Sequence, residues 1–374
     1  MEISYMRMWQ MTKRKLVLED GTTFIGTAFG SNQNTQGEVI CNTGMSGYQE
    51  MMTNPSYFGK IAVMTYPTIG AYGVNRDDFE SIMPTLNGMI VKEACAEPSN
   101  FRSEETIAAY MEKYNIPGIS GIDTRKLTRH IRKKGSMRAR IADEAEDVSD
   151  KSFSSLQTDE EMIQTASIAK PYIVPGRGMR IVLIDLGMSQ SILHELTERG
   201  CHITVVPYDY ANEAIQAYKP DGILLSNGPG NPKEARQTIQ AVQTLLGKYP
   251  IFGIGLGHQI MALAYGAKTK NLHMGNYGVN FPVKSMQTDR TWITTQSRSY
   301  YVDENSITGT GLEITHRSLN DHTIEGLSHI KDNAFAVQFH PQGAPGSNES
   351  NELFDQFIKN MESYAAQNGG HTHA

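Results

Sequence analysis

A glycine-rich turn in the second half of the chain has the pattern of a catalytic loop. The stretch PIFGIGLGHQIMALAYGA, residues 250–267, runs from an apolar segment through closely spaced glycines into a segment of helical character. This order predicts a buried strand, a tight turn and a helix, the arrangement on which many enzymes mount a nucleophile. The apex of the turn is Gly255, which has no side chain to react.

Three interpretations of this turn are open from its residues. A dinucleotide-binding loop requires G-x-G-x-x-G and an acidic residue about 20 positions further on. Position 258 is a histidine, and residues 259–288 contain no Asp or Glu, so this interpretation fits poorly. A nucleophile elbow needs small residues on both sides of the nucleophile, which Gly253 and Gly257 provide. The third interpretation is a purely structural turn in a packed core.

Alternating strand and helix patterns surround the turn. The apolar runs MRIVLIDLG, HITVVPYD, DGILLSNGPGNP and PIFGIGLG alternate with the helical patterns SILHELTERG and KEARQTIQAVQTLLGKY. Short connections between such segments predict an α/β fold with a parallel sheet covered by helices on both faces. Ligands bind beyond the carboxyl ends of the strands in these sheets. The loops SNGPGNP and GIGLGHQ both follow predicted strand ends.

The first half of the chain mixes short strands, glycine turns and a basic helix. KLVLEDGTTFIGTAFG places alternating apolar residues around Asp-Gly, which predicts a hairpin. GIDTRKLTRHIRKKGSM predicts a helix with Asp123 or Thr124 as its N-cap. Its basic side chains are Arg125, Lys126, Arg129, Arg132, Lys133 and Lys134. A solvated helix face explains this cluster most simply, and a binding face is the alternative.

The composition indicates an ordinary protein of two domains. The 374 residues carry a formal net charge of −6, which gives no reason to expect a nucleic-acid partner. No apolar run approaches the roughly 18 residues that span a membrane, and the N-terminus lacks the apolar core of a secretion signal. Cys41, Cys95 and Cys201 are far apart and lack metal-ligand spacing. We therefore expect a reduced, cytoplasmic protein without a bound metal.

Many motifs, in order, resemble those of the carbamoyl phosphate synthetase small subunit, whose second half is a class I glutamine amidotransferase domain. They include GYQEMMTNPSYFGKI, TYPTIGAYGVN and GIDTRKLTRHIRKKG, then LLSNGPGNP, FGIGLGHQ, GNYGVNFPVK and FAVQFHPQGAPG. The resemblance covers about residues 13–365. It implies an N-terminal mixed α/β small-subunit domain (1–150), a linker (151–178), an amidotransferase-like domain with a mainly parallel sheet flanked by helices (179–365) and a flexible tail (366–374).

The resemblance also assigns roles to residues. In that family a cysteine at the turn attacks the side-chain amide of glutamine, the histidine of an H-P-E motif is the base, and the glutamate orients it. These positions fall on Gly255, His340 and Gln342, so only the histidine is kept. A thioester cannot form without a thiol, and an amide cannot stabilise the imidazolium as a carboxylate does. The implied glutamine-binding residues are Ser56, Gly228, Gly230, Leu256, Gln259, Ser297, Ser299 and Tyr300.

Further departures from the family pattern accompany Gly255. Where the family has a QNHGY-type stretch, this chain has QSRSY, which puts Ser297, Arg298 and Ser299 in place of Asn, His and Gly. Ser189 stands where the family often has Lys. Several changes around one pocket fit relaxed selection on one function. Elbow nucleophiles adopt backbone angles that cost about 1–3 kcal/mol, and glycine adopts them freely, so we expect the turn itself to persist.

The resemblance implies a heterodimer with a large chain that uses ATP and a divalent metal. That chain makes carbamoyl phosphate from bicarbonate and ammonia, for pyrimidine and/or arginine synthesis, while the small chain needs no cofactor and supplies ammonia from glutamine. We expect the glutaminase step of this chain to be lost, leaving a vestigial glutamine pocket. The alternatives are a free-standing pseudo-amidotransferase that binds a ligand or regulates a partner, and a hydrolase with another nucleophile such as Ser297.

Overall fold

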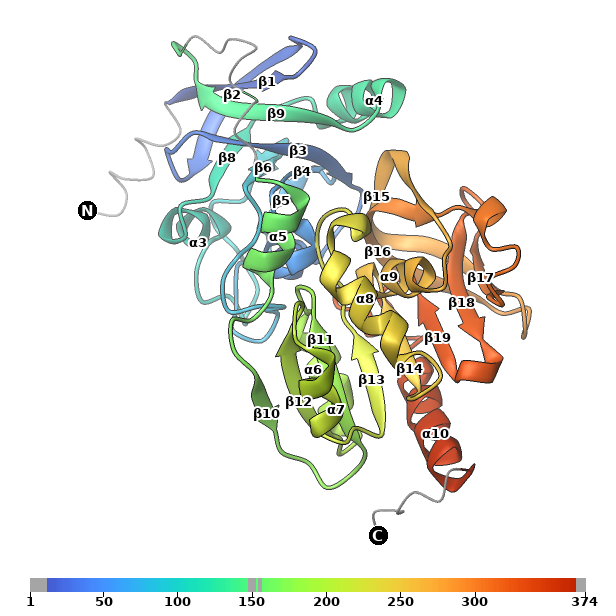
Figure 1. Cartoon of the computed structure of the whole chain (residues 1–374). Coiled ribbons are helices and arrows are strands. Elements are labelled where there is room, and N and C mark those ends of the chain that lie inside the picture. The colour runs from blue at the N-terminus through green and yellow to red at the C-terminus, as the bar shows by residue number, and fades with distance from the viewer. Residues whose placement is uncertain (1–11, 147–152, 154–156, 368–374) are drawn as a thin grey trace. The chain divides into compact units, whose positions relative to one another are not determined.

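The computed structural model describes residues 12–146, 153 and 157–367 (Figure 1). The chain forms two compact units, each described here by itself. The first comprises Met1–Gln157 with His273–Tyr277, and the second comprises Thr158–Leu272 with Gly278–Ala374. The predicted tail, residues 366–374, lies outside the described residues except for its first two positions, which end the last helix.

A mixed sheet forms the centre of the first unit. The predicted hairpin is confirmed, since β1 (Lys13–Leu18) and β2 (Thr23–Gly30) pair antiparallel around the Asp-Gly turn. Parallel pairs join β3 (Thr35–Asn42), β4 (Lys60–Met64), β6 (Gly88–Ile90) and β8 (Pro117–Ser120). Strand β9 (Met137–Asp143) runs antiparallel to both β1 and β3. The shorter elements are α2 (Tyr48–Thr53), η1 (Pro55–Tyr57), β5 (Thr68–Ile69), β7 (Glu93–Ala94) and α3 (Ile107–Lys113).

The basic helix of the first unit is α4 (Thr124–Lys134). Its N-cap is Asp123, whose carboxylate accepts a hydrogen bond from the backbone N–H of Lys126 at 2.9 Å, so one of the two predicted caps is confirmed. Leu127 and Ile131 are buried in the core of the unit. The six basic side chains named above are exposed, because they occupy the remaining positions of the helix.

The second unit contains the predicted parallel sheet. Its strands are β11 (Arg180–Asp185), β12 (His202–Pro207), β13 (Gly222–Leu225), β14 (Ile251–Ile254) and β19 (Ala334–Val337). They lie in the order β12-β11-β13-β14-β19, and each neighbouring pair is parallel (Figure 1). Strand β10 (Tyr172–Val174) adds antiparallel to β12, and β18 (Ile324–His329) and β17 (Glu313–Ser318) extend the other edge. The long strands β15 (Thr269–Ser285) and β16 (Thr291–Val302) follow α9 along the chain, and His273–Tyr277 within β15 belong to the first unit.

Helices cover both faces of this sheet, as the sequence predicts. Alternate residues of β11 point to opposite faces, with Val182 and Ile184 in one core and Ile181 and Leu183 in the other. Helices α8 (Arg236–Leu245) and α9 (Leu256–Ala264) pack on the first face, and α6 (Gln190–Glu198) and α10 (Glu352–Gln367) pack on the second. The shorter elements are α7 (Asn212–Ala217), η3 (Pro232–Glu234), η4 (Glu304–Ser306) and η5 (Ile330–Asp332).

The segment assigned to a linker, residues 151–178, contains regular structure that its composition does not predict. Helix α5 (Asp159–Ala166) begins with a capping box between Thr158 and Glu161. Ile163 is fully buried in the core of the second unit. The buried side chain of Ile163 therefore packs α5 against the core, although the acidic residues of this segment predict a solvent-exposed stretch. Within the described part of the chain, no helix has both the length and the apolar character to cross a membrane.

Candidate active site

The turn between β14 and α9 is set by its backbone. Gly255 is the N-cap of α9, with φ 59° and ψ −109°, so the unfavourable conformation expected at this position is confirmed. Its N–H donates to the carbonyl of Val337 at 2.9 Å, which ties the turn to the neighbouring strand β19. A Cβ at Gly255 would lie 3.3 Å from Cβ of Asn227, which is close but not a severe overlap. The position therefore has room for a side chain, although only glycine adopts these angles without strain.

A second glycine loop follows β13, at the same edge of the sheet. A Cβ at Gly228 would lie 2.1 Å from the carbonyl oxygen of Leu186, so packing requires glycine there. The Cδ2 atom of Leu256, at the start of α9, would be 3.0 Å from that Cβ. Gly230 has φ 84°, which also favours glycine. Both predicted loops thus lie beyond the carboxyl ends of adjacent parallel strands, where ligands of such sheets bind.

His340 follows β19 and lies in the same group of loops. Its backbone N–H donates to the carbonyl of Thr295 on β16 at 2.9 Å. The imidazole is almost completely buried. Burial lowers the pKa of His340 to about 4, so the ring is neutral at pH 7.

The two ring nitrogens of His340 have different partners. Nε2 lies 2.6 Å from the hydroxyl oxygen of Ser297, and the side-chain amide nitrogen of Gln342 lies 3.1 Å from Nδ1. The direction of both hydrogen bonds depends on the tautomer of the ring. A base that takes a proton through Nε2 needs the tautomer with its own proton on Nδ1, which a carboxylate at position 342 would favour by accepting from Nδ1–H. The neutral amide of Gln342 offers no negative charge to stabilise the imidazolium that forms.

Gln342 is buried with an unsatisfied amide. Its Oε1 atom has no hydrogen-bond partner among the described residues. A buried carbonyl oxygen without a partner is energetically costly. The side chain thus holds the ring in place through one bond without giving it a negative partner.

Strand β16 presents different side chains on its two faces. Ser297 and Ser299 are half-buried, whereas Gln296 and Arg298 are buried. This alternation follows from the pleat of a strand, whose successive side chains point to opposite faces. Arg298 pairs with the buried carboxylate of Glu325, not with His340. The departure from the family pattern at Arg298 therefore lies on the face of β16 opposite Ser297 and Ser299.

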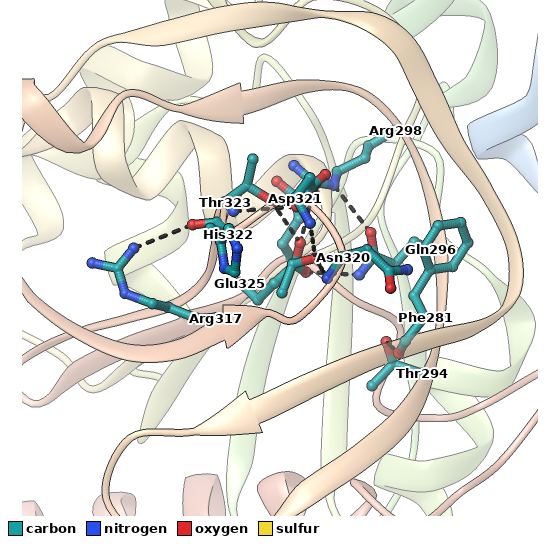
Figure 2. Close-up of polar contacts among 12 residues, drawn as sticks. Phe281, Thr294, Gln296, Arg298, Arg317, Asn320, Asp321, His322, Thr323 and Glu325 are labelled. Atoms are coloured by element: carbon teal, nitrogen blue, oxygen red, sulfur yellow. Dashed lines mark hydrogen bonds and ion pairs between the residues drawn. The ribbon is translucent and has the colours of Figure 1, made fainter. Parts of the chain in front are cut away.

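The Arg298–Glu325 pair lies within a polar network. Gln296 donates to Oε2 of Glu325 at 3.0 Å and accepts from Nε of Arg298 at 3.2 Å. Thr323 accepts from Nη2 of Arg298 at 2.8 Å (Figure 2). Burial raises the pKa of Glu325 to about 7, and the positive charge of Arg298 opposes this shift. Sequence reasoning missed this pair, although a charged residue between two predicted pocket residues on a strand was a usable signal.

The remaining predicted residues occupy distinct places. Gln259 is buried on α9. Its amide nitrogen donates to the carbonyl of Tyr300 at 2.9 Å and to Oε1 of Gln338 at 2.8 Å. The hydroxyl of Ser189 accepts a hydrogen bond at 3.1 Å from the side-chain amide of Asn227. Asn227 is the residue that a side chain at Gly255 would contact.

Ser56 belongs to the first unit, whereas the other predicted site residues belong to the second. It lies in η1, is buried, and its backbone N–H donates to Oδ1 of Asn54 at 2.9 Å. This Asx turn accounts for its local geometry. The structure therefore groups the predicted residues of the second unit and leaves Ser56 as part of another unit.

Comparisons with known proteins place both units in one family. Residues 182–360 match glutamine amidotransferase class-I, which defines the class of the second unit. Residues 16–141 match the carbamoyl-phosphate synthase small chain, CPSase domain. The chain belongs to the carbamoyl phosphate synthase small chain family.

Relatives match over nearly the whole chain. It is 50% identical over 366 residues to the carbamoyl phosphate synthase small chain of Oceanobacillus iheyensis, covering 97% of this chain and 100% of the relative. It is 50% identical over 353 residues to the carbamoyl phosphate synthase pyrimidine-specific small chain of Halalkalibacterium halodurans, covering 94% and 98%. The carbamoyl phosphate synthase small chain of Staphylococcus saprophyticus is 47% identical over 357 residues, covering 95% and 97%.

Proposed function

We propose that this chain is the small chain of a carbamoyl phosphate synthase whose own glutaminase step is lost. The observation that carries the proposal is the strand-turn-helix elbow, which keeps a positive φ at Gly255 but has no nucleophile there. In the resembled family this is the position of the attacking cysteine. Without a thiol, no thioester can form with the side chain of glutamine.

Two other cysteines are poorly suited to replace the missing thiol. Cys201 precedes β12 and so lies at the amino end of the sheet, opposite the edge that carries Gly255. Burial raises the pKa of Cys201 to about 11, and the pKa of Cys41 in the first unit to about 11 as well. Both are protonated at pH 7, whereas the thiolate is the reactive form.

The surroundings of His340 are the second support. A glutaminase base becomes positively charged when it accepts a proton, yet the group next to Nδ1 is the neutral amide of Gln342, and burial lowers the pKa of the ring to about 4. Ser297 is a poor substitute nucleophile, because it lies within strand β16 and not at the elbow.

We further propose that the chain works as a heterodimer with a large chain. That partner would hold ATP and a divalent metal and make carbamoyl phosphate from bicarbonate and free ammonia, in the cytoplasm. The product would enter pyrimidine or arginine synthesis, and the name of one relative is pyrimidine-specific. Similarity over nearly the whole length of small chains supports this role more than that of a free-standing regulatory module.

Reconstitution with a candidate large chain tests the proposal. We expect ammonium-dependent synthesis of carbamoyl phosphate and no glutamine-dependent synthesis above background. The control is the same large chain with a small chain that keeps cysteine at the elbow, which should support both. A glutamine-dependent rate comparable with the ammonium rate would refute the loss of glutaminase, and failure to copurify would refute the partnership.

We propose that the exposed basic face of α4 lies at or near the large-chain interface. All six basic side chains are exposed in a chain whose net charge is −6. Reversing Arg125 and Arg129 to Glu should weaken assembly and increase its dependence on salt. The matched control reverses Lys233 and Arg236, which are exposed basic residues of the second unit. Equal assembly of both double variants at low and high salt would contradict this placement.

A further inference from the structure

The buried ion pair of Arg298 and Glu325 is saturated with hydrogen bonds. The Arg298 side chain is 2% exposed and that of Glu325 is 0% exposed. Oε1 of Glu325 accepts from Arg298 and from Thr323, while Oε2 accepts from Gln296. A buried pair is tolerated only when its remaining polar atoms are satisfied in this way. The network is therefore rigid (Figure 2). It lies on the back face of β16, which is the face opposite Ser297 and Ser299.

A chain of hydrogen bonds connects this pair to the elbow. Nη1 of Arg298 donates to the carbonyl of Tyr300 at 3.3 Å, and that same oxygen accepts from Gln259 at 2.9 Å. Gln259 also donates to Oε1 of Gln338 at 2.8 Å. The amide nitrogen of Gln338 donates to the carbonyl of Gly255 at 3.3 Å. The guanidinium is thus joined to the elbow through two glutamines on separate elements.

The backbone provides a second connection. The N–H of Gln338 donates to the carbonyl of Glu325 at 2.9 Å. Gln338 directly follows β19, the strand whose last residue accepts the bond from Gly255. Both members of the ion pair therefore reach the elbow through Gln338.

We propose that Arg298 is a positioning residue of this site. Its planar guanidinium binds Glu325, Gln296 and Thr323 on the back of β16 and still reaches the Tyr300 carbonyl. Lysine could not reproduce this, because an ammonium lacks the fixed fork of donors. Through the chain of hydrogen bonds, Arg298 fixes Gln259 and Gln338 and so the orientation of the Gly255 peptide. This role does not depend on the proposed function, since it concerns the shape of the elbow and not its chemistry.

Hydrogen–deuterium exchange of the full chain tests this role at peptide resolution. In Arg298→Met we expect exchange to accelerate at least tenfold in the elbow and the first turn of α9, residues 255–259, as well as in β16 to β18. A purely local structural role would accelerate only β16 to β18. The matched control is Arg199→Met, which removes ion pairs to Glu195 and Asp355 on helices away from the elbow. In that variant the elbow should change less than twofold.

Two further variants keep the test decisive if Arg298→Met does not fold. Arg298→Lys keeps the charge but loses the fork, and should accelerate elbow exchange at least threefold. Gln338→Leu removes the side-chain hydrogen bonds next to the elbow and leaves the ion pair intact. Amide exchange should therefore accelerate in the elbow but not in β17. Combining the last two should be non-additive at the elbow, because both break one chain. Elbow exchange within twofold of the unmodified chain in either single variant, or equal acceleration in Arg199→Met, would overturn the proposal.

Discussion

The two faces of strand β16 share one backbone but differ in chemistry. On one face, Ser297 makes one hydrogen bond to the neutral ring of His340. The side-chain amide of Gln342 lies next to the other ring nitrogen, and its Oε1 atom has no hydrogen-bond partner among the described residues. On the opposite face, Arg298 and Glu325 form a buried ion pair with every carboxylate oxygen bonded. Because alternate side chains of a strand point apart, a substitution on one face of β16 need not disturb the contacts on the other.

The elbow shows the same separation between shape and chemistry. Its position depends on two hydrogen bonds to the backbone of Gly255: the Gly255 N–H donates to the Val337 carbonyl, and the side-chain amide of Gln338 donates to the Gly255 carbonyl. Neither bond involves a side chain at position 255. Replacing a nucleophile by glycine therefore removes the reaction and also relieves strain, since glycine adopts these angles freely. A retained active-site fold is consequently weak evidence for retained activity.

Rebuilding the reactive face should give the largest effect. Gly255→Cys alone should restore little glutaminase, because Gln342 cannot stabilise a charged His340. Adding Gln342→Glu places a carboxylate next to Nδ1, which favours the tautomer whose Nε2 can accept a proton and stabilises the imidazolium that forms. The two changes should be strongly non-additive, by orders of magnitude, since triad members act as a unit. The measurements are ammonia release from glutamine and a thioester adduct on the new cysteine, detected by mass spectrometry.

Ser297→Asn and Ser299→Gly sharpen this prediction. Ser297 now binds Nε2 of His340, where the new thiol would have to bind. Removing that hydroxyl in the double variant should raise activity further. If Gly255→Cys alone equals the quadruple variant, the proposed decay of the whole pocket is wrong. The matched control is Gly255→Ser with the native Ser297 kept, since this variant fills the elbow with a side chain that has no thiol.

The sequence predicts the frame of the site better than its present contacts. Strand and helix alternation predicts the parallel sheet, and glycine spacing locates the elbow, because both depend on local patterns. The pairing of Arg298 with Glu325 joins residues 27 positions apart on different strands, which no local pattern specifies. The hydrogen bond between Ser297 and His340 is equally hidden, since it joins residues 43 positions apart. Helix α5 was missed because one buried residue, Ile163, anchors an otherwise acidic segment.

The next-largest expected difference between the two faces of β16 is in the free energy of unfolding that their side chains contribute. Arg298→Met leaves Glu325 buried without its counterion, which typically costs about 3–5 kcal/mol. Ser297→Ala removes one hydrogen bond to a neutral ring, which typically costs about 1 kcal/mol. The double variant Arg298→Met with Glu325→Gln should lose less than the sum of its single changes. Chemical denaturation followed by circular dichroism gives these values, and equal losses for Arg298→Met and Ser297→Ala would remove the contrast between the faces.

The smallest expected effect is a pH dependence of opposite sign on the two faces. Burial raises the pKa of Glu325 from 4.5 to about 7, so the folded state favours the protonated acid. Its contribution to stability is therefore full below pH 4.5 and is lost as pH rises towards 7. His340 has its pKa lowered to about 4, so its contribution is full above pH 6.5 and is lost as pH falls towards 4.

Glu325→Gln isolates the back-face contribution. The difference in unfolding free energy between the unmodified chain and this variant should fall as pH rises from 5 to 7, by at most about 1.4 kcal/mol per pH unit. Above pH 8 the difference should be constant, because Glu325 is then ionised in both states. His340→Gln should give a difference that rises over pH 4 to 6. A difference for Glu325→Gln that rises with pH would mean that Arg298 lowers the carboxylate pKa more than burial raises it, and the back face would then be stabilised by its charges at neutral pH.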